Sequence, residues 1–211
     1  MAMEQLPLCD VVLTQIKINS GQTYSFATAD EISCEPVLEE GEEKNLTIKS
    51  KLIAKKQTPD MILGHDITCK DNVFTPELLA DLQGGTVTKS SGTKFSKYTA
   101  PNVGALPSTK TFEFTAYVEI VGNNGPTGEY LKYTFPNCKG SFISPNFKDG
   151  EYFAAEYKIK SRPTLNTSLY TVELVSSLPL NAEIFEHPAI VAQREAEEQE
   201  VKQIKEKKSI Y

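Results

Sequence analysis

Hydrophobic and polar residues alternate along most of this chain, and a period of two is the pattern of β-strands. In the clearest stretch, Phe112, Phe114, Ala116, Val118 and Ile120 fall on one face. Strands of the same kind are predicted over residues 11–18, 24–28, 31–37, 61–68, 131–135, 153–160 and 170–174. Together with residues 44–56 they make about nine strands, which predicts a mainly β fold, a sandwich or barrel.

Prolines, glycines and polar runs mark the expected breaks between strands. Pro36 is expected to stop the strand that begins at Glu31, and Pro136-Asn137 to turn the chain. The stretch 122–128 predicts a hairpin loop. Residues 88–110 have no hydrophobic periodicity, so they predict a long loop that is either functional or disordered.

One stretch, residues 75–84, has helical signals instead. Thr75 can cap the first turn, Pro76 suits the first helical position, and Gly84 can end the helix. Phe74 and Leu79 have the spacing of a hydrophobic staple. The sequence therefore predicts one helix of about two turns, stable only when it packs on the sheet.

The faces of this helix can also be predicted. Leu78, Leu79 and Leu82 form one apolar stripe, which we expect to be buried. Glu77 and Asp81 are expected to point outward or to lie at a subunit boundary.

Residues 44–58 are predicted to form an extended hairpin arm. Apolar residues alternate here with lysines over a length that exceeds an ordinary strand. Exposed strand edges tend to associate unless they are charged, so a solvated edge strand and an assembly arm both remain open. For the assembly arm, the candidate subunit contacts are Lys49, Lys51, Ile53, Lys55 and Lys56.

The last segment, residues 181–211, is rich in Glu and Lys. This change in composition predicts a charged tail that is distinct from the β domain of residues 1–180. Its thin apolar stripe is typical of a frayed, exposed helix, and the alternative is an arm that becomes ordered on another subunit.

Composition narrows the class of protein. The chain has 211 residues and a net charge of −6, so the basic footprint of a nucleic-acid-binding protein is absent. No apolar run reaches membrane-spanning length and residues 1–5 lack a secretory pattern, so we expect synthesis and folding in a cytoplasm. Accordingly, the scattered Cys9, Cys34, Cys69 and Cys138 are expected to be free thiols.

The motifs of common enzymes are missing. Neither His65 nor His187 has a metal-binding motif around it, and the sequence has no nucleophile elbow. Gly92-Thr93-Lys94 lacks the upstream glycine and the ending of a phosphate loop. We therefore predict no catalytic, cofactor-binding or metal-binding residues, and expect that the protein is not an enzyme.

The order of these features resembles that of a known family over residues 8–180. The resemblance rests on ATADEI at 27–32, LGHDIT at 63–68, FTPEL at 74–78, LQGG at 82–85, YTFPNCKG at 133–140 and DGEYF at 149–153. In these segments the chain is similar to the major tail tube proteins of long-tailed bacteriophages with non-contractile tails, mainly those infecting Gram-positive hosts. Residues 181–211 have no counterpart in it.

The resemblance implies a virion protein that is made in the host cytoplasm and carries no cofactor. Its subunits would close into hexameric rings, and the rings would stack into a tube through which DNA passes without specific binding. The implied partners are copies of itself, a tape measure protein, and tail terminator and baseplate proteins, with no membrane. The 44–58 arm and the 88–110 loop would connect neighbouring rings, and the helix would cover the outer side of a barrel wall.

Two alternatives remain. One is another β-rich ring component, from a baseplate, a head–tail joint or a secretion tube, which would form a single ring rather than a filament. The other is a carbohydrate-binding or hydrolytic β-sandwich, although the chain has no Trp for a sugar-binding platform.

Overall fold

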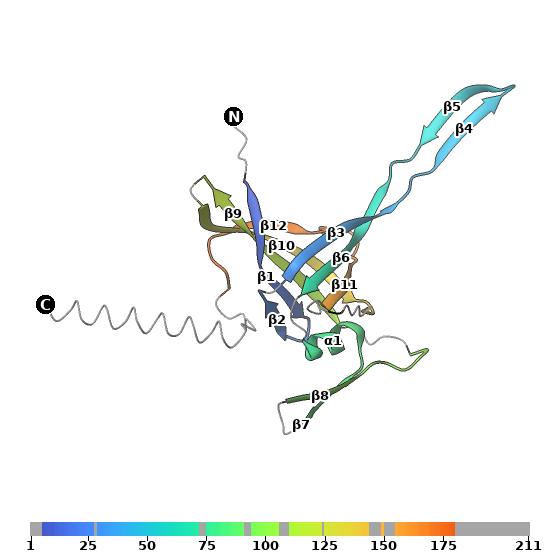
Figure 1. Ribbon diagram of the computed structural model, residues 1–211. Coiled ribbons are helices and arrows are strands. Elements are labelled where there is room, and N and C mark those ends of the chain that lie inside the picture. Colours follow the sequence, from blue (N-terminus) through green and yellow to red (C-terminus); the bar gives the residue numbers. More distant parts are fainter. Residues whose placement is uncertain are drawn as a thin grey trace, which may run out of the picture.

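The computed structural model describes residues 6–27, 29–71, 75–90, 94–105, 110–123, 125–143, 149 and 155–179 (Figure 1). Within them the fold is mainly β with one short helix, as the alternation predicts. The main sheet contains β1 (Leu8–Ile18), β2 (Thr23–Phe26), β3 (Ala29–Glu39), β6 (Met61–Asp71), β9 (Thr111–Gly122), β10 (Gly125–Gly140), β11 (Ala155–Ser161) and β12 (Thr171–Val175). Two separate hairpins contain β4 (Glu43–Ile48) with β5 (Lys51–Gln57), and β7 (Thr86–Ser90) with β8 (Lys94–Thr99).

The main sheet is antiparallel and has the order β2-β1-β9-β10-β11-β6-β3. One edge of β10 is shared, since β12 pairs with Tyr130–Thr134 and β11 pairs with Cys138–Gly140. The sheet curls until β1 approaches β3, but these two strands do not pair, so it does not close into a barrel.

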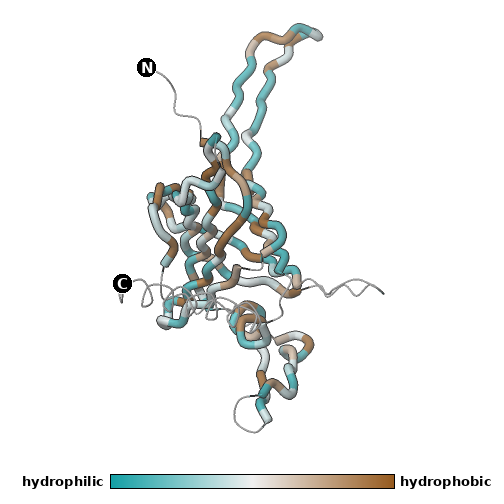
Figure 2. The backbone as a smooth tube through the Cα atoms, turned by 60° about the vertical axis from the view of Figure 1, so that its left-hand side comes forward, coloured by the Kyte–Doolittle hydropathy of each residue, from teal (hydrophilic) through white to brown (hydrophobic). Residues whose placement is uncertain are grey.

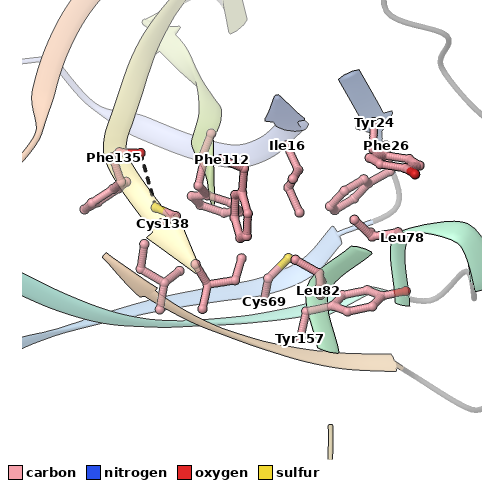
Figure 3. Close-up of a cluster of buried hydrophobic side chains, with 14 of the residues drawn as sticks. Ile16, Tyr24, Phe26, Cys69, Leu78, Leu82, Phe112, Phe135, Cys138 and Tyr157 are labelled. Carbon is pink, nitrogen blue, oxygen red and sulfur yellow. Dashed lines mark hydrogen bonds between the residues drawn. The ribbon is translucent and has the colours of Figure 1, made fainter. Parts of the chain in front are cut away.

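A single hydrophobic core lies on the concave side of this curled sheet. Strands from opposite ends of the sheet contribute to it, for example Phe26 from β2, Phe112 from β9 and Tyr157 from β11 (Figure 3). The predicted alternation of β9 is confirmed, because Phe112, Phe114, Ala116 and Ile120 are all buried.

The predicted helix is confirmed as α1 (Pro76–Gln83), with Pro76 in its first turn. Leu78, Leu79 and Leu82 are buried, and two of them join the concave core (Figure 3). The helix therefore closes one end of the curled sheet and does not cover its outer side, which corrects the expectation drawn from the family.

The two ends of α1 differ from prediction in detail. Thr75 precedes the helix in an extended conformation, and its side chain makes no capping hydrogen bond. At the other end Gly84 has the expected positive φ of 85°, and its N–H donates to the Ala80 carbonyl oxygen at 2.9 Å. Phe74, and with it the predicted staple, lies outside the described residues.

The outward orientation predicted for Asp81 is wrong, because this side chain is buried. Its carboxylate accepts a hydrogen bond of 2.8 Å from the Tyr24 hydroxyl and pairs with Lys110 at 2.5 Å. These two contacts satisfy the carboxylate where it leaves water. Glu77 stays partly exposed and pairs with Lys89 of β7 at 2.9 Å.

The two predicted proline breaks are also wrong. Pro36 lies inside β3 opposite His65; no described strand pairs with the other edge of β3, so the missing N–H is tolerated there. Pro136 and Asn137 form a bulge inside β10, where the register shifts between Phe135 and Cys138. Asn137 has a φ of 50°, which asparagine accepts more readily than most residues.

Part of the predicted long loop is structured. Strands β7 and β8 form a hairpin within residues 86–99, although their side chains are mostly exposed. The hairpin is tied to α1 through Tyr98, whose hydroxyl donates to the Gly84 carbonyl oxygen at 2.6 Å and accepts from the Gln83 amide at 2.9 Å. Residues 181–211 lie outside the described part of the chain.

Candidate functional site

The most distinctive feature of the surface is the arm formed by β4 and β5, which projects far from the curled sheet (Figure 1). It continues the β3–β6 pair, whose register reaches Glu39 opposite Met61. At the root of the arm, the Thr58 N–H donates to the Glu42 carbonyl oxygen at 3.0 Å. The Gly41 N–H donates to the Asp60 carboxylate at 2.8 Å, so the direction of the arm is set by hydrogen bonds.

The arm turns at Lys49-Ser50, so residues 44–56 are two short paired strands rather than one long one. Both turn residues have positive φ, 47° for Lys49 and 64° for Ser50. That is the requirement of a type I′ hairpin turn, which usually contains Asn and Gly. Because neither is present here, the sequence carries no ordinary signal for this turn.

The pairing assigns the side chains of the arm to two faces. Leu46 opposes Ala54 and Lys44 opposes Lys56 on one face, whereas Thr47 opposes Leu52 on the other. Ile53 is the extra residue at a bulge, where the register shifts between Leu46 and Thr47. Every residue of β4 and β5 is exposed.

Large apolar side chains are exposed along this arm. Those of Leu46, Ile48, Leu52 and Ile53 are each more than half exposed. Figure 2 shows hydrophobic segments on the otherwise polar arm, close to its tip. Because an isolated two-stranded hairpin is only marginally stable in water, an arm of this kind gains stability when a partner covers it.

The predicted contact residues Lys49, Lys51, Ile53, Lys55 and Lys56 therefore all lie on the arm, with Lys49 in its turn. The structure brings them together on one projection but does not test their role. Lys55 pairs with Glu43 at 3.0 Å, and Lys44 pairs with Glu42 at 2.9 Å. Within the described residues, Lys49 and Lys51 at the tip make no ion pair, and neither does Lys56 nearer the root, so the tip of the arm is basic.

A second feature, which sequence reasoning missed, is a groove between β1 and β3. It encloses about 610 Å³ and is lined by Asp10, Asp30 and Glu31 together with Leu8 and Cys9. Asp10 has a φ of 42° and lies where the β1–β9 register shifts, between Cys9 and Val11. Glu31 pairs with Lys70, whereas Asp10 and Asp30 form no ion pair with any described residue.

An apolar cavity of about 310 Å³ adjoins this groove inside the curled sheet. Val11, Ile32 and Val118 line both spaces, so these three side chains lie between the groove and the cavity. Phe135 and Tyr170 stack in the cavity wall with ring centroids 5.5 Å apart.

His65 belongs to the wall of this cavity. It lies in β6, as predicted, with 8% of its surface exposed, and its ring meets those of Phe135 and Tyr170 edge-on. Burial and the nearby Arg162 guanidinium hold the pKa of His65 below its ordinary value of 6.5. Arg162 donates to the His65 carbonyl oxygen at 2.9 Å and to the Asp66 carboxylate at 2.6 Å, which connects β6 to the end of β11.

The described residues hold no group of three His, Cys, Asp or Glu side chains that could bind a metal ion. All four cysteines are free thiols, as predicted, with Cys9 and Cys34 exposed and Cys69 and Cys138 buried. Burial raises the pKa of both buried thiols to about 12, so neither forms a thiolate near neutral pH. Over the part of the chain described, no helix has the length and hydrophobicity needed to cross a membrane.

Comparison with known proteins gave no matching family model and no matching curated protein. Several solved structures resemble the fold weakly, including two from the anti-feeding prophage. One is the anti-feeding prophage cap, described as the AFP tube terminating cap, with a TM-score of 0.44 and 10% identity over 83% of this chain and 96% of the other. The second belongs to the baseplate of the anti-feeding prophage, with a TM-score of 0.41 and 9% identity over 83% of this chain and 100% of the other.

Proposed function

We propose that this chain is a structural subunit of a phage-type tail, which assembles with copies of itself into hexameric rings that stack into a DNA-conducting tube. The single observation that carries the proposal is the arm formed by β4 and β5. It exposes large apolar side chains on a hydrogen-bonded projection that the described residues of its own chain leave uncovered. The sequence resemblance to tail tube proteins supplies the class of assembly.

The edges of the main sheet support self-assembly as well. Strand β2 pairs only with β1, and β12 pairs only with β10, so each leaves one edge without a strand neighbour among the described residues. Such edges associate readily with other strands. A tube built from repeated copies can cover them, because a heterologous interface that closes into a ring places the same two surfaces together at each step.

The proposal assigns no catalytic activity and no cofactor to the chain. A net charge of −6 suits a conduit from which DNA must slide, since the excess of carboxylates over Lys and Arg opposes the binding of phosphates. Tape measure, terminator and baseplate proteins are proposed as further partners on the sequence resemblance alone.

The test uses the purified chain and a variant without the arm. Glu43 and Gln57 face each other in the β4–β5 register, so residues 44–56 can be replaced by Asn-Gly, a natural two-residue hairpin turn. We expect the wild-type chain to form rings or tubes in negative-stain electron microscopy as its concentration rises. The variant should keep the circular dichroism spectrum and melting temperature of the unassembled wild-type chain at low concentration, because the arm contributes nothing to the core. It should fail to stack at any concentration.

Tubes of normal appearance from the variant would contradict the assembly role of the arm. A wild-type chain that stays monomeric at every concentration would contradict self-assembly. A wild-type chain that stops at one discrete ring would favour the alternative of a baseplate or head–tail joining component.

A further inference from the structure

The groove between β1 and β3 has an acidic opening and an apolar floor, which are the properties that a binding site for the arm would need. Strand β1 pairs with β2 only over Thr14–Lys17, so the first half of β1 faces β3 across an unpaired gap. Asp10 and Asp30 line the opening without an ion-pair partner among the described residues. The bulge at Asp10 removes this residue from the β1–β9 register, as bulges do when they redirect a side chain.

Behind the acidic opening the surface is apolar. Val11, Ile32 and Val118 line both the groove and the inner cavity of about 310 Å³. A ligand that matches this site therefore needs an apolar group to enter and positive charge around it.

The tip of the arm has both properties. Ile48, Leu52 and Ile53 are each more than half exposed, and Lys49 and Lys51 lie between or beside them. Residues 43–57 contain five lysines and one glutamate, although the whole chain is acidic. Charge and hydrophobicity are therefore complementary between two separate surfaces of the same chain.

The tip cannot reach the groove of its own chain. Ala29, in the groove lining, is nineteen residues before Ile48 at the tip. At the rise of an extended strand this is roughly 60 Å of chain, and Figure 1 shows the arm directed away from the sheet. The occupant that fits is thus the arm of a second copy.

We propose that the arm tip of one copy docks in the β1–β3 groove of the next, with Leu52 and Ile53 over the apolar floor and Lys49 and Lys51 beside Asp10 and Asp30. This inference rests on the proposed self-assembly and names the surface that receives the arm. Because tip and groove are different surfaces, the contact is heterologous and can repeat from copy to copy.

Cysteine crosslinking tests the contact directly, because the exposed Cys9 lies in the groove. In the full chain carrying Cys34→Ser, the variant Ser50→Cys places a thiol in the arm turn. Mild oxidation with diamide should join residue 50 of one copy to Cys9 of another. The matched control is Leu165→Cys, whose position is 95% exposed and distant in sequence from both surfaces.

Docking raises the local thiol concentration to about the millimolar range, so the yield of dimer through Cys9 should exceed that of the control on the order of tenfold. Peptide mass mapping identifies the disulfide, and Cys9→Ser should abolish it. Equal yields from the two variants, or a disulfide from Cys9 to any residue other than 50, would overturn the proposal.

A charge exchange gives a second readout. Lys49→Glu with Lys51→Glu, or Asp10→Lys with Asp30→Lys, should each raise the concentration required for assembly about tenfold, the equivalent of about 1.4 kcal/mol. A mixture of the two variants should assemble normally, since each reversed tip then meets a reversed groove. Rings or tubes that form without crosslinking and without rescue would refute the groove contact while leaving self-assembly intact; chains that neither assemble nor crosslink would refute both.

Discussion

Gly140, at the end of β10, sets how closely α1 can approach the sheet. A Cβ atom at this position would stand 2.3 Å from the Leu82 carbonyl oxygen and 2.6 Å from its Cα. Real Cβ atoms do not come within 3.0 Å of such neighbours, and these are backbone atoms that cannot rotate away. In Gly140→Ala the helix must therefore move by about 1 Å, which loosens the contacts of Leu78 and Leu82 in the core.

The cost can be estimated from this displacement. Overpacking of a well-packed core typically costs about 1–3 kcal/mol. Replacing glycine also reduces the freedom of the unfolded chain, which returns about 0.4–1 kcal/mol. We expect a net loss of about 1–2 kcal/mol in the free energy of unfolding, or a melting temperature lower by about 2–8 °C for a chain of this size.

Urea unfolding followed by circular dichroism measures this loss. The variant without the arm is the best background, because assembly would otherwise add to apparent stability. Gly122→Ala is the control, since its nearest neighbour is a single side-chain atom, Thr127 Cγ2, at 3.3 Å rather than backbone atoms below 3.0 Å. A Gly140→Ala chain as stable as Gly122→Ala would refute the close packing of α1 on β10.

Three further predictions concern the core, the arm turn and the buried histidine. Leu82→Ala should lower the free energy of unfolding by about 2–5 kcal/mol, while Leu165→Ala, at a side chain 95% exposed, should leave it nearly unchanged; similar losses would mean that α1 is misplaced. Lys49→Asn combined with Ser50→Gly places residues that accept positive φ in the arm turn, where other residues pay about 1–2 kcal/mol each. Amide hydrogen exchange in the arm should therefore slow at least about tenfold; unchanged exchange would contradict the turn geometry. Burial lowers the pKa of His65 in the folded chain, so the unfolded chain takes up the imidazole proton first as the pH falls below about 6.5. The free energy of unfolding should therefore decrease as the pH falls from 7 to 5. In urea unfolding, His65→Gln should make this pH dependence weaker, whereas an equal pH dependence would refute the burial of His65.

Local features were predictable from the sequence because they depend on near neighbours in the chain. The alternation of Phe112, Phe114 and Ala116 follows from the period of a strand, and the burial of Leu78 and Leu82 follows from that of a helix. The exposed arm was also predictable, since apolar residues alternate there with lysines over a length that exceeds an ordinary strand. Its turn was not, because Lys49-Ser50 lacks the residues that usually mark one.

Pairing between segments far apart in the sequence decided the features that local patterns did not predict. Pro36 is tolerated inside β3 only because that strand lies at an edge, and Asn137 makes a bulge instead of a turn because β9 and β11 both hold β10 in place. Asp81 is buried because Tyr24 and Lys110, far away in sequence, supply its partners.

The β1–β3 groove shows most clearly the difference between what local sequence predicts and what tertiary structure decides. Asp10 lies in no motif, and Asp30 lies only in the segment 27–32 that contributes to the family resemblance, which marks neither residue as part of a site. They become one site only when the sheet curls and leaves β1 unpaired beside β3. The sequence by itself determined the helix, the arm and the strands of the main sheet, since these depend on side-chain periodicity over a few residues, but not β7 and β8, which lack that periodicity. Tertiary structure alone decided which edges stay open and which charges meet, because both depend on the strand order and the curvature of the whole sheet.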